Sequence, residues 1–119
     1  MNGKKMKLKA ISIKQPWIDL IINGKKTIET RKWKTSYRGP LLLVSSKKPQ
    51  IGLAGYALGI ADLINCKKMV KDDEIMSCCK LYPKANSWFL KNIKKIKPFK
   101  VNGKLGIYEI EVDKIEIIN

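Results

Sequence analysis

The sequence contains no histidine, the side chain that most often acts as a general base in enzymes. No Ser–His–Asp or Cys–His nucleophile can therefore be assembled, and any catalysis would rely on lysines, carboxylates, hydroxyls or thiols. Cysteine is scarce as well: Cys66, Cys78 and Cys79 have no CxxC spacing, and no histidine is present to complete a zinc site. We expect three reduced thiols, and we predict no metal and no cofactor.

Long apolar runs are absent too, because no stretch reaches the roughly 18 residues needed to cross a membrane. The basic residues 1–5 lead into an alternating segment and not into the apolar region of a signal peptide, which predicts an intracellular, cytoplasmic protein. A chain of 119 residues that is 45% hydrophobic can bury a core as one domain. We expect a single domain over 1–119, with residues 1–6 and 114–119 at its periphery and an unspecified oligomeric state.

Acidic residues and arginine are both few. Ten acids against 25 basic residues give a net charge of +15, and only Arg31 and Arg38 among the basic residues are arginine. The first 50 residues hold 13 of the basic residues but only two acids, Asp19 and Glu29. This asymmetry favours a positive face suited to a polyanion, and the alternative is a surface solvated by lysine throughout.

The pattern of apolar residues predicts a mostly β fold. Pro16 suits the first position of a short early helix, and Gly24 suits a left-handed cap at its end. Gly59 within an apolar strand indicates a bulge or a close backbone approach, and acids at 72–74 predict the start of a mid-chain helix. The expected fold class is α+β: a small mixed β-barrel with two short helices. Strands are predicted at residues 7–13, 27–33, 41–44, 55–64, 87–90, 94–101 and 107–112.

The most distinctive group of side chains is Lys26, Glu29 and Arg31. If residues 27–33 are extended, Glu29 and Arg31 share one face and Lys26 lies at the start of the strand. Arginine offers a rigid fork of donors for carboxylate, phosphate or a base edge; an ordinary surface ion pair is the alternative. Asp62 lies in an apolar strand, so it either points out of the sheet or meets a cation, for which Lys26 or Arg31 would serve.

Aromatic residues accompany the basic ones nearby. Trp33 and Tyr37 alternate with lysines and Arg38, a mixture that suits stacking on a nucleobase while neighbouring charges hold phosphate. The alternative is that these rings cover one end of a barrel. Gln15 and Trp17 likewise allow two interpretations, as a wall of a site or as a helix start with a core tryptophan.

The spacing Gly24, Lys26, Glu29 and Arg31 reproduces G-x-K-x-x-E-x-R, and with its flanks the sequence resembles the ASCH domain family of the PUA-like superfold. The likeness covers roughly residues 7–113. Its further matches are Ser12 to Trp17, Trp33 to Pro40, Gly59 to Cys66, Ser87 to Asn92 and Gly103 to Tyr108.

This resemblance implies a small β-barrel with a cleft beside the first helix, and a role in RNA binding. Some small bacterial relatives resemble amidohydrolases of N4-acylated cytidines, which use a Lys, a Thr and a Glu. Lys26 matches that Lys, but Glu29 stands where the Thr falls, so this role does not carry over; Glu74 matches the Glu only by rough position. A carboxylate beside Lys26 also favours the ammonium form, which is not nucleophilic.

The leading hypothesis is an RNA- or nucleotide-binding module in which Lys26, Glu29 and Arg31 form the floor of a cleft. Glu29 would accept from an exocyclic amine, and Arg31 would take phosphate or a base oxygen. One alternative is a nucleoside amidohydrolase in which Lys26 activates the attacking group and Glu29 or Asp62 moves the proton. Another is an interaction domain for acidic proteins. The predicted ligand-binding residues are Lys14, Gln15, Trp17, Lys26, Glu29, Arg31, Trp33 and Arg38.

Overall fold

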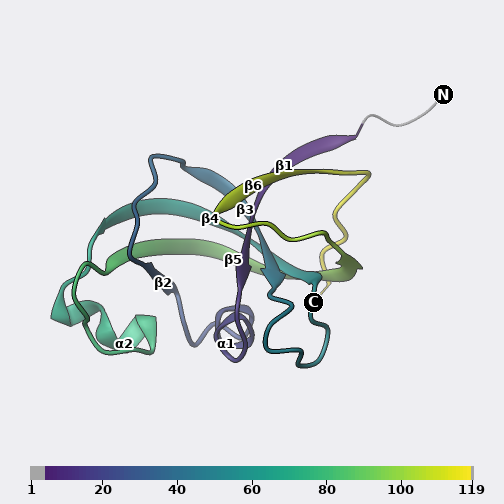
Figure 1. Cartoon of the computed structure of the whole chain (residues 1–119). Helices are drawn as coiled ribbons and strands as arrows, with labels where there is room; N and C mark the ends of the chain where they lie inside the picture. Colours follow the sequence, from purple (N-terminus) through teal and green to yellow (C-terminus); the bar gives the residue numbers. More distant parts are fainter. Residues whose placement is uncertain (1–4, 119) are drawn as a thin grey trace.

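The computed structural model describes residues 5–118 and contains one six-stranded mixed sheet in the order β2-β5-β4-β3-β1-β6 (Figure 1). The mostly β fold with two short α-helices is confirmed. The sheet is open, with β2 and β6 at its two edges, and does not close into the expected barrel. The elements are β1 (Met6–Ile13), α1 (Trp17–Ile22), β2 (Ile28–Arg31), β3 (Gly39–Ser45), β4 (Tyr56–Lys68), the 3-10 helix η1 (Lys71–Asp73), α2 (Glu74–Ser77), β5 (Asn86–Lys100) and β6 (Ile107–Val112).

The centre of the sheet carries apolar side chains on both faces. β3 pairs in parallel with β1 and antiparallel with β4, and its run from Leu41 to Val44 is fully buried, as the sequence predicts. Leu41 and Leu43 join the cluster that α1 covers through Ile18 and Ile21. Leu42 and Val44 join a second cluster, because successive side chains of a strand point to opposite faces.

The two strands predicted at residues 87–90 and 94–101 are one continuous strand, β5. Its register with β4 shifts three times, and Asn92 has a positive φ of 54°. Irregularities of this kind add residues to one strand and break the period-two pattern. The break in alternation therefore marks a distorted strand and not the end of one.

α1 packs close to the sheet at Gly59, where the predicted close approach is confirmed. A Cβ atom at this position would overlap the Ile22 side chain of α1 and would lie 3.0 Å from the carbonyl oxygen of Lys94. The β3–β4 and β4–β5 registers also shift near this residue. The glycine thus allows the helix to lie directly on a bulged part of the sheet.

Gly59→Ala is expected to lower the free energy of unfolding by about 1–3 kcal/mol, because the added methyl group must displace Ile22. Urea denaturation of the variant and the parent measures this loss. Ile22→Val removes the overlapping Cδ1 atom, so it should restore part of the stability when combined with Gly59→Ala. Strictly additive effects of the two substitutions would contradict this packing account.

The structure describes only part of the two ends of the chain. Residues 1–4 and Asn119 lie outside the described residues, so part of the expected periphery is not described. Near the C-terminus, Ile117 forms an antiparallel bridge with Ile96 of β5. Within residues 5–118, no helix is long and apolar enough to span a membrane.

Candidate functional site

The turn after α1 holds the backbone of Lys26 against the end of the helix. Gly24 has a φ of 81°, the left-handed conformation predicted for it, and the amides of Lys25 and Lys26 both donate to the carbonyl of Leu20. The chain then enters β2, which pairs with the first part of β5. The end of α1 and the edge strand β2 therefore hold neighbouring parts of the motif.

Lys26, Glu29 and Arg31 form one buried ion-pair group, called the triad below. Glu29 Oε1 lies 3.4 Å from Lys26 Nζ, while Glu29 Oε2 accepts hydrogen bonds from Arg31 Nε at 3.2 Å and Nη2 at 2.9 Å. Lys26 is 2% exposed and Glu29 is 8% exposed. The triad is therefore not the exposed surface ion pair considered as an alternative, because both of these charges are withdrawn from water.

Backbone carbonyls complete the surroundings of the two cations. Lys26 Nζ donates to the carbonyl of Ser77 at 2.5 Å, and Arg31 Nη2 donates to the carbonyl of Ser12 at 3.0 Å. No acceptor within residues 5–118 engages Arg31 Nη1 or the third hydrogen of the Lys26 ammonium. Two cations and one carboxylate leave a net positive charge, and the unfilled positions on the cations are all donors.

The triad forms the floor of a cleft of about 470 Å³, within the size range of small-molecule sites. Four cations line it, Lys14, Lys26, Arg31 and Lys104, whereas Glu29 is the only acid among the described lining residues. Trp17 of α1 contributes an aromatic wall, and its ring centroid lies 5.6 Å from Lys26 Nζ. The other lining residues are Ser12, Thr30, Ser46, Cys79, Tyr82, Leu105 and Gly106.

Three of the predicted ligand-binding residues do not line this cleft. Gln15 donates from Nε2 to Asp19 within the first turn of α1, at 3.0 Å. Trp33 packs edge-on against Trp88, with 4.7 Å between ring centroids. Arg38 donates from Nη1 to the carbonyls of Thr35 and Tyr37 in its own loop. The remaining five, Lys14, Trp17, Lys26, Glu29 and Arg31, all line it.

Asp62 does not pair with Lys26 or Arg31, so the second of the two alternatives considered for it, contact with one of these cations, is wrong. Its Oδ2 accepts a hydrogen bond from Asn92 Nδ2 at 2.9 Å, and the side chain is only partly buried. Burial, and secondarily the charge of Asp62, raise the pKa of Tyr37. The two cations pair with Glu29 instead, and Asp62 does not line the cleft.

Sequence reasoning missed the wall that comes from the segment after α2. Tyr82 donates from its hydroxyl to Thr30 Oγ1 at 3.0 Å, and Thr30 Oγ1 lies 3.7 Å from Cys79 Sγ. All three cysteines are free thiols. Nothing local in the sequence marks Tyr82 or Cys79, because only the fold brings them beside β2. For Leu105, the only signal in the sequence was that an apolar residue stands in a turn flanked by Gly103 and Gly106.

Ser12 connects the floor of the cleft to the second core cluster. Its carbonyl accepts from Arg31, while its hydroxyl lies 2.8 Å from the hydroxyl of Tyr108 on β6. Burial raises the pKa of Tyr108, although the hydrogen bond to Ser12 acts in the opposite direction. Ser12, which accepts from Arg31, is therefore itself held by a partly buried hydrogen bond between β1 and β6.

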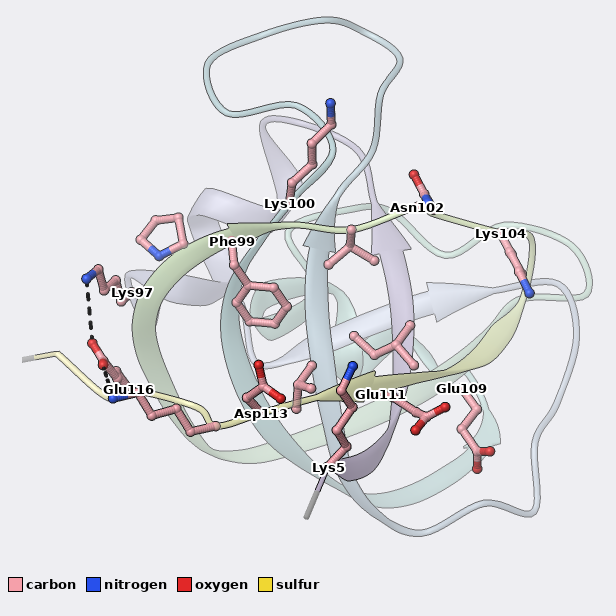
Figure 2. Close-up of a pocket in the computed structure, with 15 residues that line it drawn as sticks. Lys5, Lys97, Phe99, Lys100, Asn102, Lys104, Glu109, Glu111, Asp113 and Glu116 are labelled. Carbon is pink, nitrogen blue, oxygen red and sulfur yellow. Dashed lines mark ion pairs between the residues drawn. The ribbon is translucent and has the colours of Figure 1, made fainter. Parts of the chain in front are cut away.

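A larger hollow of about 710 Å³ lies between the end of β5 and β6 and contains none of the triad (Figure 2). Its rim carries charges of both signs: Lys97 and Lys114 pair with Glu116, and the acids of β6 face the same space. Five lysines and four acids line it, so their charges nearly cancel. Lys104 borders both hollows, but only the cleft over the triad has the excess of cations that a polyanion requires.

A mostly β fold with two short helices and a cleft beside the first of them is what the resemblance to the PUA-like superfold implies, although the sheet here is open. The family model of the ASCH domain matches residues 11–100. The chain therefore belongs to the ASCH domain family, as its sequence motif indicates.

Solved structures of ASCH proteins from Zymomonas mobilis share this fold. A tyrosine-to-phenylalanine variant is 17% identical, with a TM-score of 0.59 over 80% of this chain and 76% of that one. A serine-to-alanine variant is 15% identical, with a TM-score of 0.62 over 96% and 92%. No curated protein sequence matches this chain. At such low identity these likenesses establish the fold alone.

Proposed function

We propose that this ASCH domain binds RNA or a nucleotide in the cleft above the triad. The observation that carries the proposal is the chemistry of the floor, where two cations held by Glu29 line the cleft and keep donor positions that no acceptor within residues 5–118 fills. Phosphate oxygens and base carbonyls are the acceptors that arginine and lysine bind in nucleic acids. Membership of the ASCH family supports the same general class of ligand.

We assign Glu29 a role in holding the two cations, in place of the contact with a ligand amine considered from the sequence alone. Its Oε2 accepts two hydrogen bonds from Arg31 and its Oε1 forms an ion pair with Lys26 at 3.4 Å, so we assign it mainly to orienting the two cations and not to accepting from a ligand amine. Because the cations are fixed before the ligand arrives, little side-chain entropy is lost on binding. Lys14 and Lys104 at the rim add longer-range attraction for a phosphate backbone.

The amidohydrolase alternative receives less support from this geometry. A nucleophilic Lys26 needs a lone pair directed at the substrate, yet its Nζ donates to the carbonyl of Ser77 and lies 3.4 Å from the Glu29 carboxylate. Glu74, the candidate for the second carboxylate, accepts from the amide of Leu81 at 2.8 Å and does not line the cleft. The arrangement therefore favours holding a ligand over hydrolysing one.

The two arginines allow a test at constant net charge. Arg31→Lys keeps the charge but removes the planar fork, and it is expected to weaken binding of a labelled single-stranded RNA about tenfold. Arg38→Lys makes the same substitution outside the cleft and should leave affinity unchanged. Fluorescence anisotropy at low ionic strength, repeated over a salt series, measures both effects.

Two outcomes would reject the proposal. One is the absence of RNA binding even at low ionic strength. The other is an equal response of the two arginine variants, which would assign binding to the overall charge of the surface. An acidic protein partner, the remaining alternative, would meet exposed lysines and would be insensitive to Arg31→Lys.

A further inference from the structure

The open positions on the two cations of the cleft floor are all hydrogen-bond donors. After the contacts within the triad and with backbone carbonyls are counted, one hydrogen of Lys26 Nζ and the two of Arg31 Nη1 have no acceptor within residues 5–118. The Glu29 side chain is only 10% exposed, and both oxygens are engaged. A ligand edge that reaches this floor therefore meets donors and has to supply acceptors.

The walls of the same cleft are apolar on two sides. Trp17 of α1 is 38% exposed and lines one part. Leu105, in the loop between β5 and β6, is 98% exposed and lines another. A single exposed leucine is ordinary, but here it shares a cavity with a tryptophan and three lysines. Such walls suit a flat ring, because a nucleobase stacks on an aromatic face and buries its own apolar faces.

We infer that the cleft prefers nucleotides whose base has a carbonyl oxygen at C4 of a pyrimidine or C6 of a purine, uracil and guanine, over cytosine and adenine, which have an amine at that position. This inference rests on the proposed function and specifies its ligand. O4 of uracil and O6 of guanine accept hydrogen bonds from lysine and arginine, whereas the amines at the same positions of cytosine and adenine are donors. An amine facing Lys26 and Arg31 would leave hydrogen-bond donors unpaired and shielded from water, which reduces the free energy of binding.

A phosphate group is a second source of acceptor oxygens for the same floor. If phosphate occupies the triad, all four nucleotides should bind equally, because they share that group. If the base occupies it, affinity should depend on the base, and ribose 5-phosphate should bind weakly. Base dependence therefore separates the two sources.

The test compares UMP, CMP, GMP, AMP and ribose 5-phosphate by isothermal titration calorimetry. UMP and CMP form the sharpest pair, because they differ only at the pairing edge of one pyrimidine ring. We expect UMP and GMP to bind about 5- to 150-fold more tightly than CMP and AMP, which corresponds to about 1–3 kcal/mol. The same ratio should appear between oligouridine and oligocytidine as competitors for the labelled RNA, and this second assay decides the matter if single nucleotides bind too weakly.

Three variants test the walls and the floor separately: one in a wall, its matched control outside the cleft, and one in the floor. Leu105→Ala should weaken UMP and CMP alike, about threefold to tenfold, without changing their ratio. Leu53→Ala, at another exposed loop leucine that does not line the cleft, should change neither affinity. Arg31→Lys should reduce the ratio itself, because the fork that reads the carbonyl is lost.

The outcomes separate this inference from the proposed function. Equal affinity for all four bases, or a preference for CMP and AMP, overturns the inference and leaves RNA binding intact. Failure of both nucleotides and RNA to bind rejects the two together. A UMP preference that survives Arg31→Lys unchanged would overturn the assignment of base selection to the triad.

Discussion

Glu29→Gln is expected to lower the free energy of unfolding by about 3–5 kcal/mol, although it replaces a single oxygen by an amide group. In the folded protein the Glu29 carboxylate neutralises the buried Lys26 ammonium and accepts two hydrogen bonds from Arg31. A neutral amide removes that charge and turns an NH2 group toward one of the two cations. Lys26 would then be a charge that is 2% exposed and bonded only to the carbonyl of Ser77.

Glu109→Gln is the matched control for this prediction. Glu109 lies 3.5 Å from Lys9, but both side chains are more than 40% exposed, at 48% and 42%. Exposed pairs of this kind contribute about 0–1 kcal/mol. Urea denaturation monitored by tryptophan fluorescence compares the two variants directly, and similar small losses in both would contradict the view that the triad is a buried ion-pair group.

A double-mutant cycle separates the ion pair from other effects of the substitution. Lys26→Met alone leaves Glu29 with one cation, whereas Lys26→Met combined with Glu29→Gln removes both charges of the close pair. Removing both partners of a buried pair costs less than the sum of the single losses. A double variant that loses the full sum would show that Lys26 and Glu29 are not coupled.

The local parts of the site could be predicted from the sequence because they follow from short-range geometry. Gly24 has the positive φ expected of a helix cap. Alternation along β2 places Glu29 and Arg31 on one face, since side chains two residues apart on a strand point the same way. These features depend only on residues a few positions apart, so the spacing of the motif is enough to predict them.

The parts that could not be predicted depend on contacts between distant segments. The register between β4 and β5 shifts between Ile60 and Asp62, so strand period alone cannot assign the partner of Asp62. Tyr82 precedes β5 in the sequence and Leu105 follows it, both line the cleft, and no local pattern connects them to β2. The same bulges made one long strand look like two, and the absence of pairing between β2 and β6 leaves the sheet open.

The cleft and the core of this domain share their supporting residues. Trp88 of β5 pairs directly with Glu29 of β2 in the antiparallel register, so their side chains lie on the same face of the sheet. Trp88 is fully buried within the cluster that α1 covers. Packing around this indole therefore contributes both to the core and to the dry surroundings that the triad requires.

Trp88→Ala is expected to destabilise the domain by about 3–5 kcal/mol, the usual cost of truncating a buried aromatic residue. The substitution opens a cavity beside the triad and removes the edge-to-face contact with Trp33, whose ring lies at 87° to that of Trp88. It also removes the hydrogen bond from Trp88 Nε1 to the carbonyl of Trp33, at 3.4 Å. Chemical denaturation followed by circular dichroism measures the loss independently of tryptophan emission.

Trp33→Ala provides the comparison, because it removes the other ring of the same pair. Trp33 is 39% exposed, so its truncation should cost clearly less than that of Trp88; the contact between the rings accounts for about 0.5–1.5 kcal/mol. Combining the two substitutions should cost less than their sum, since the ring contact can be lost only once. Equal losses at the two positions would mean that Trp88 contributes no more than a surface ring, and would contradict its place between the core and the triad.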